Sequence, residues 1–245
     1  MSGIAQLFDN DSPLGRAVTK AGTYIAVNLL FIIGSLGIVT IGASLSAMYY
    51  TLMKYQRGGK EINPFRLFVK GFCENFIKAT AVWVGVLCLI SVLLLEMFWC
   101  SQAAGVMHLF LYGLGTVLLT AAVTAVYTFP GIAAFDAPVG RQLLNSLFFA
   151  GKSPVTVLPV VGAWLLPFYI TYSFMEWMPL WAFLWCCFGF AAAANVQAHF
   201  LLRLYAPYLA AAGGAEADKT ESRQSLAGAQ RTQRQILKDM KRLGM

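Results

Sequence analysis

The hydrophobic pattern of this chain consists of long apolar segments separated by short polar connections. Residues 21–53 contain no charged side chain, and the sequence SLGIVTIG at 35–42 interrupts them near the middle. A basic stretch follows, with Lys or Arg at 54, 57, 60, 66, 70 and 78. An uncharged run of this length is typical of membrane-spanning helices, because about 20 helical residues cross the hydrocarbon core of a bilayer.

The whole chain contains six such segments. They cover residues 20–37, 42–54, 75–99, 106–129, 155–175 and 179–203. Four of them are long enough to span, the first is marginal, and 42–54 is short. The pattern predicts an all-α fold, a polytopic membrane bundle of about six helices that begins with a short broken hairpin.

The positions of Lys and Arg predict the topology. Basic residues precede the first segment and follow the second, fourth and sixth, whereas the other connections carry none. If 42–54 crosses, every basic loop lies on one side, so both termini are expected in the cytoplasm of a bacterial cell. The expected organisation is a cytoplasmic segment 1–19, a membrane domain 20–205 and a basic cytoplasmic tail 206–245.

Two connections have the pattern of amphipathic helices. In 64–78, aromatic and aliphatic residues recur at helical spacing, namely Phe65, Phe68, Val69, Phe72 and Phe76. In 136–150 the apolar side is formed by Leu143, Leu144, Leu147 and Phe148. Such helices lie in the membrane interface or dock against a partner.

Composition excludes several function classes. The chain is 58% hydrophobic and only 12% charged, and its net charge of +7 lies mostly beside apolar runs. The charge therefore marks membrane topology and lipid headgroups rather than a nucleic-acid site. Five cysteines without C-x-x-C spacing argue against a disulfide framework or a zinc site. We expect no cofactor and no metal.

Catalytic motifs are missing from the sequence. Gly151-Lys152-Ser153 resembles the end of a phosphate-binding loop, but position 146 is Ser where the motif needs Gly, and Pro154 removes a donor. There is no Ser-His-Asp set, no H-E-x-x-H motif and no paired carboxylates on one surface. The protein is therefore not expected to be an enzyme.

The last apolar segment carries a polar stripe. Asn195, His199 and Arg203 are spaced by four residues, while Gln197 lies on another face. The stripe could line a cavity, but a structural or helix-interface role is favoured because interhelical hydrogen bonds often use such residues. Asn75 and Asn145 occupy comparable positions in or near the two amphipathic helices.

The first eighty residues resemble a known family. Asn28-Leu29-Leu30, the stretch from Ser35 to Ala43, Ala47-Met48-Tyr49-Tyr50 and the block from Asn75 to Thr80 are similar to the YesL family of bacterial membrane proteins. The sequence departs at Gly37, where that family usually has Pro. Both residues interrupt a helix. The matching candidates are Asn28, Thr40, Gly42, Asn75 and Phe76.

The resemblance implies a role without naming a reaction. The family is a domain of unknown function, and its members tend to be encoded beside carbohydrate-uptake ABC transporter components. It implies a non-catalytic accessory or regulatory subunit that contacts the lipid bilayer and an ABC permease. The alternative is a small-molecule transporter or channel with its site at the broken hairpin, because discontinuous helices expose backbone groups to substrates.

Overall fold

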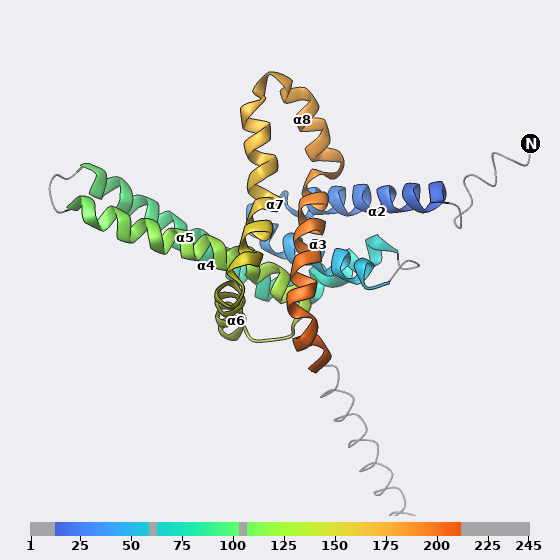
Figure 1. The fold of residues 1–245 in the computed structure, drawn as a ribbon, viewed down its shortest axis with the longest axis horizontal. Coiled ribbons are helices and arrows are strands. Elements are labelled where there is room, and N and C mark those ends of the chain that lie inside the picture. The colour runs from blue at the N-terminus through green and yellow to red at the C-terminus, as the bar shows by residue number, and fades with distance from the viewer. Residues whose placement is uncertain (1–12, 59–62, 103–106, 212–245) are drawn as a thin grey trace, which may run out of the picture. The chain divides into compact units, whose positions relative to one another are not determined.

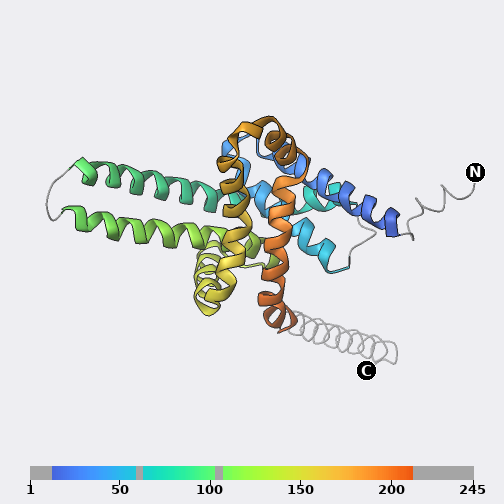
Figure 2. The ribbon, with the colours of Figure 1, turned by 45° about the horizontal axis from the view of Figure 1, so that its top comes forward.

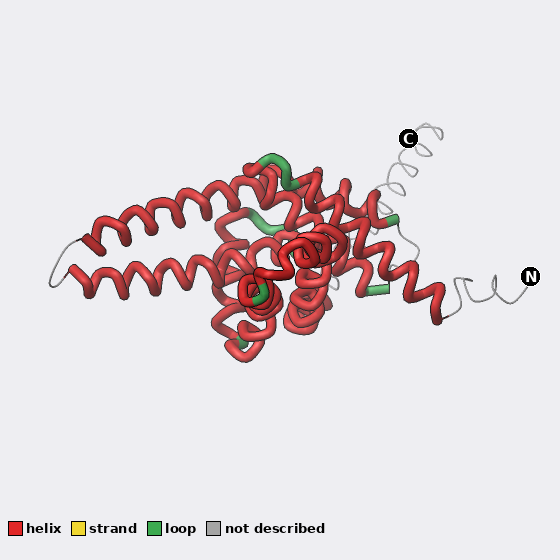
Figure 3. Tube along the Cα trace, turned by 90° about the horizontal axis from the view of Figure 1, so that it is seen from above, coloured by secondary structure: helices red, strands yellow, loops and turns green. Residues whose placement is uncertain are grey.

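The computed structural model describes residues 13–58, 63–102 and 107–211, which form helices joined by short loops, with no strand among them (Figures 1 and 3). The all-α fold predicted from the sequence is confirmed. The chain divides into two units, residues 1–202 and 203–245. Residues 1–12 of the expected N-terminal segment and 212–245 of the expected tail lie outside the described residues.

The first unit contains all the labelled helices. They are α2 (Pro13–Gly34), α3 (Ile41–Gln56), α4 (Pro64–Gln102), α5 (Met107–Ala134), α6 (Val139–Lys152), α7 (Pro154–Ser173) and α8 (Met178–Leu184). Short turns of 3₁₀ helix cover Ile38–Thr40 and Met175–Trp177, and a π-helical turn covers Trp185–Gly189. The α-helical backbone resumes over 190–202, and in the second unit residues 203–211 are helical.

Among the residues that the structure describes, five helices are long and apolar enough to cross a membrane, so this is a multi-pass membrane protein. They are Ala17–Gly34, Pro64–Gln102, Phe110–Ala134, Pro154–Ser173 and Met175–Ala211. The predicted short segment 42–54 forms α3, whose 16 residues fall below the length of about 20 that a span requires. Its crossing, and the side on which the termini lie, remain predictions.

The predicted amphipathic helix 64–78 and the predicted span 75–99 form one continuous helix. At 39 residues, α4 is about 58 Å long, nearly twice the hydrocarbon core of about 30 Å. Its start is locally encoded, because the Asn63 side chain accepts the Phe65 amide at 3.0 Å and Pro64 occupies the first helical position. The other amphipathic helix, α6, begins after Pro138 rather than at Asp136.

The centre of the first unit is α3. Its residues Ala43, Ala47, Met48 and Leu52 are fully buried, and it packs against α2, α4 and α5. Two antiparallel hairpins adjoin it, α4 with α5 and α7 with the helix that starts at α8 (Figures 1 and 2). The second arm of the broken hairpin is therefore the core of the unit, whereas Leu36, Ile38 and Val39 in the break itself are exposed.

Candidate functional site at the broken first hairpin

Asn28 of α2 is completely buried and binds the π-helical turn. Its Nδ2 donates to the carbonyl oxygens of Trp185 at 2.9 Å and Cys186 at 2.7 Å. Its Oδ1 accepts the Ala191 amide at 2.9 Å. In a π turn the amide bonds five residues back rather than four, and the return to α-helix leaves backbone groups without their usual partners. Asn28 thus bonds to three backbone groups at and just after this turn, across the interface between the two helices.

Aromatic rings surround this contact. Phe190 lies with its ring centroid 5.2 Å from Phe31 of α2 and 4.8 Å from Trp185. Trp185 also stacks on Phe168 of α7 at 4.5 Å. A Cβ on Gly189 would lie 2.6 Å from the Trp185 ring, so glycine makes room for that ring inside the π turn.

The break itself is held by Thr40 and Trp83. The Thr40 hydroxyl lies 2.7 Å from the Gly34 carbonyl and 2.6 Å from that of Gly37, and it can donate to either. The indole nitrogen of Trp83 in α4 donates to the Ile38 carbonyl at 2.8 Å. The contact to Gly34 satisfies a carbonyl at the C-terminus of α2, and the contact to Ile38 satisfies a carbonyl inside the break. Gly37 is exposed and has ordinary negative φ.

Gly42 lets α3 approach α4 closely. A Cβ at this position would lie 2.5 Å from the Trp83 Cβ and 2.6 Å from the Ala79 carbonyl oxygen. The backbone oxygen cannot move aside without distorting α4, so any larger residue separates the two helices. Gly42 is thus required for packing rather than for exposing backbone to a ligand.

A second polar cluster, which we call the Tyr49 cluster, joins α3, α5, α7 and the helix over 190–202. The Tyr49 hydroxyl donates to Gln197 Oε1 at 2.5 Å, and Trp164 Nε1 lies 2.6 Å from the same oxygen and 3.1 Å from the Tyr49 hydroxyl. Gln197 Nε2 donates to the Val126 carbonyl at 2.9 Å. Gln197 and Tyr49 are buried, so their polar atoms serve helix packing.

The predicted stripe on the last segment does not act as one surface. Gln56 of α3 donates to both the backbone oxygen of Asn195 at 2.9 Å and its side-chain oxygen at 2.7 Å. His199 is exposed, with its ring beside Phe200. Arg203 belongs to the second unit and is exposed. The residue that reaches the interior is Gln197, two positions from Asn195 on another face.

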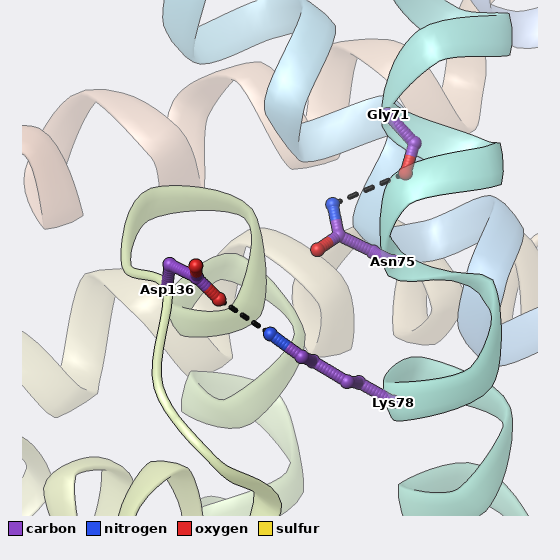
Figure 4. A network of polar contacts seen from close by, with 4 residues as sticks. All are labelled: Gly71, Asn75, Lys78 and Asp136. Carbon is purple, nitrogen blue, oxygen red and sulfur yellow. Dashed lines mark hydrogen bonds and ion pairs between the residues drawn. The ribbon is translucent and has the colours of Figure 1, made fainter.

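The candidates on the amphipathic helices make only local contacts or lie at the surface. Asn75 donates to the Gly71 carbonyl one turn earlier at 3.1 Å (Figure 4). Phe76 is exposed, and its ring lies tilted beside that of Phe72 with centroids 5.4 Å apart. Asn145 is half-buried on α6. The structure therefore does not bring these three residues into the site around Asn28.

One ion pair connects α4 with the segment between α5 and α6. Lys78 donates to Asp136, whose carboxylate is almost fully exposed (Figure 4). The hydrogen bond and the charge of Lys78 lower the pKa of Asp136 below its ordinary value. Because both groups reach water, the contact is expected to contribute little free energy.

An apolar groove of about 620 Å³ lies between α7 and residues 181–196. The lining includes Thr171, Trp181 and Trp185, whose polar atoms are bonded within the protein: Trp185 donates to Thr171 at 3.0 Å and Trp181 to the Phe174 carbonyl at 3.1 Å. A sugar site needs polar groups directed at the ligand. Among the residues that the structure describes, no group of three or more His, Cys, Asp or Glu could hold a metal ion.

The partners of Asn28 and most of the Tyr49 cluster were not among the residues that the sequence predicted. A signal for Gln197 existed in the sequence, because Ala191, Ala194 and Ala198 share one helix face with it, and the structure buries all of them. Small residues on one face are typical of a close membrane-helix interface. No comparable signal identified Trp164 or Trp83, since aromatic residues occur throughout the apolar segments.

Comparison with known proteins adds a family and no function. The family model described as "Protein of unknown function, DUF624" matches residues 24–97, a range that contains the broken hairpin and most of α4. No curated protein and no solved structure matches the chain. DUF624 is the YesL-like family, so the resemblance found in the sequence is confirmed and residues 24–97 of this membrane protein are a DUF624 region.

Proposed function

We propose that this protein is a non-catalytic accessory or regulatory subunit of a carbohydrate ABC importer, and that the first turns of α4 dock on the permease. The gene neighbourhood that the YesL resemblance implies supplies the partner class. The observation that carries the docking surface is the exposed apolar face at the start of α4, described next.

The start of α4 extends beyond the length that a bilayer covers. Charged residues occur every fourth position at Arg66, Lys70, Glu74 and Lys78, and the uncharged stretch of the helix begins only at 79. On the same turns, Phe65 is 58% and Val69 42% exposed. Exposed apolar side chains beside charges, outside the hydrocarbon core, are typical of a protein interaction surface.

The residues of the broken hairpin support this proposal over a transporter with its site there. Asn28 is completely buried and bonds to three backbone groups, and Gly42 is in contact with α4. Neither presents a polar group to a substrate. The groove beside α7 has an apolar lining, which suits hydrocarbon better than a sugar.

Affinity purification of the full-length protein from native membranes in mild detergent tests the proposal. We expect ABC permease subunits to co-purify, and Phe65→Ala to reduce their recovery. The matched control is Leu95→Ala on the same helix, because Leu95 is also 58% exposed but lies in the uncharged stretch. Loss of permease with both variants, or no permease under conditions that preserve a known permease complex, contradicts the proposal.

Sugar uptake by the purified protein in liposomes distinguishes the accessory role from the alternative, a transporter with its site at the broken hairpin. The accessory role predicts no uptake by this protein alone. Uptake that requires Asn28, with an Asn28→Leu variant that still folds, would replace the accessory proposal with a transporter.

A further inference from the structure

The helix α6 has its apolar side turned away from the protein. Its inward side carries Gln142, Ser146 and Phe149, which are buried against α5. A Cβ on Gly131 of α5 would lie 2.1 Å from Gln142 Nε2, and Phe149 stacks on Phe135 at 6.0 Å. The outward side carries the leucines and phenylalanine that the sequence assigned to its apolar face.

These outward side chains form one continuous strip. At about 100° per residue, Leu143, Leu147, Leu144 and Phe148 follow one another within an arc of about 140°. Leu144 is 69% and Phe148 55% exposed. A soluble helix would bury such a strip in the core, so this one requires an apolar environment outside the protein.

The position of α6 in the chain identifies that environment. It connects α5 and α7, both of which are candidate spans. With 14 residues, α6 is about 21 Å long and cannot cross a hydrocarbon core of about 30 Å. The end of α5 and the start of α7 therefore lie at the same face of the bilayer, and α6 lies at that face.

The charge of α6 indicates which lipids it meets. Arg141 and Lys152 are exposed and lie about 20–40° beyond Phe148, at one edge of the apolar strip. The ammonium of Lys152 lies 5.8 Å from the centre of the Phe148 ring. Residues 137–175 contain no Asp or Glu. A basic edge beside an apolar strip, without acids, complements anionic headgroups above acyl chains.

We propose that α6 is an interfacial helix that binds an anionic lipid surface. Leu143, Leu144, Leu147 and Phe148 enter the boundary between headgroups and acyl chains, and Arg141 and Lys152 pair with phosphate-bearing headgroups. This lipid contact is independent of the permease contact assigned to α4.

Spin labels on the full-length chain, purified alone and reconstituted in vesicles, test the depth of α6. In a background with the five native cysteines replaced by serine, single labels are placed by Leu144→Cys, Leu147→Cys and Lys152→Cys. Labels at 144 and 147 are expected to collide more with oxygen, and the label at 152 more with a water-soluble nickel complex. Equal nickel access at all three positions overturns the proposal. That result is expected if the strip is exposed to water and binds a protein partner instead of lipid.

The headgroup contact is tested with the label at 147 alone, which leaves both basic residues intact. Moving from pure phosphatidylcholine to a mixture with phosphatidylglycerol is expected to shift the label deeper. The double substitution Arg141→Gln with Lys152→Gln should abolish that shift. Identical depth in both lipids with the basic residues intact overturns the anionic preference. In the depth experiment, the labels at 144 and 147 report separately, so depth can still be measured if one of these two variants fails to fold.

Discussion

Two asparagines of the matched region, Asn28 and Asn75, have opposite environments. Asn28 lies inside the first unit and joins α2 to backbone groups more than 150 residues away in the chain. Within the described part of the chain, the hydrogen bond of the Asn75 side chain goes to Gly71 on its own helix, near the exposed Lys78 and Asp136 pair (Figure 4). This difference indicates that the broken hairpin, which we call the joint, holds helices of the first unit together. The surface at 64–78 is instead exposed and available to bind a partner.

The largest expected effect is on the close contact between α3 and α4 at Gly42. Gly42→Leu should lower stability by about 3 kcal/mol, because the new side chain meets the Ala79 carbonyl oxygen and forces α3 from α4. That corresponds to a fall of roughly 6–12 °C in the unfolding midpoint of a chain this size. Circular dichroism in detergent measures it.

The control for this prediction is Gly85→Ala on α4. A Cβ at Gly85 meets nothing within 4 Å, and alanine is the better helix former. The midpoint of Gly85→Ala should stay equal or rise. A Gly42→Leu protein with the midpoint of the wild type would show that the two helices are not in close contact.

The next effect separates the two asparagines directly. Asn28→Ala should cost about 2 kcal/mol, because it leaves the buried Ala191 amide without an acceptor. Asn75→Ala should cost only about 0.5 kcal/mol, because the half-buried side chain loses one hydrogen bond within its own helix. Thermal unfolding of both variants in one detergent makes the comparison, and similar midpoints would remove the distinction between joint and surface.

A smaller effect is expected at the Tyr49 cluster. Tyr49→Phe removes one hydroxyl, while Trp164 keeps its bond to Gln197, so the loss should be about 1 kcal/mol. The neighbouring Tyr50 offers the control, because Tyr50→Phe keeps the ring that contacts Lys54. Unfolding midpoints measure both. A larger loss from Tyr50→Phe than from Tyr49→Phe would contradict the cluster's role.

The smallest effect lies at the surface pair. Since Lys78 lowers the pKa of Asp136 in the folded protein, its stabilisation is present above the ordinary carboxyl pKa of about 3.9 and disappears as pH falls through the lowered value. The effect should stay below about 1 kcal/mol because the pair is exposed. Midpoints of the wild type and Asp136→Asn, measured from neutral to acidic pH, should converge only below that value. A difference that persists or grows in acid contradicts the ion pair.

The fold could be predicted largely because membrane segments have a strong one-dimensional signal. The break at 35–42 and the apolar segments can be recognised from the order of apolar and polar residues alone. The continuity of α4 was not, because a helix that leaves the bilayer becomes amphipathic and reads as a separate element. The sequence also could not show whether α3 crosses the membrane or forms the core, since a buried core helix and a short span have the same composition.

The site was harder to predict because its contacts join distant parts of the chain. Asn28 was selected through the family resemblance, but nothing in the sequence pointed from it to Trp185 or Ala191. The π-helical turn has no periodicity that a short segment can reveal. Asn195, His199 and Arg203 do follow helical spacing. However, the packing of the helices determines which face is buried, and the buried polar residue on this helix is Gln197.

Hydrogen exchange at residues 185–191 tests the central claim most directly, namely that Asn28 holds the π-helical turn against α2. Amide exchange is compared between the wild type and Asn28→Ala in the same detergent. Exchange is expected to be faster at Ala191 and its neighbours in the variant and unchanged in α5, because Asn28 no longer accepts the Ala191 amide. Unchanged exchange over 185–191 would contradict the claim and return the broken hairpin to the list of ligand sites.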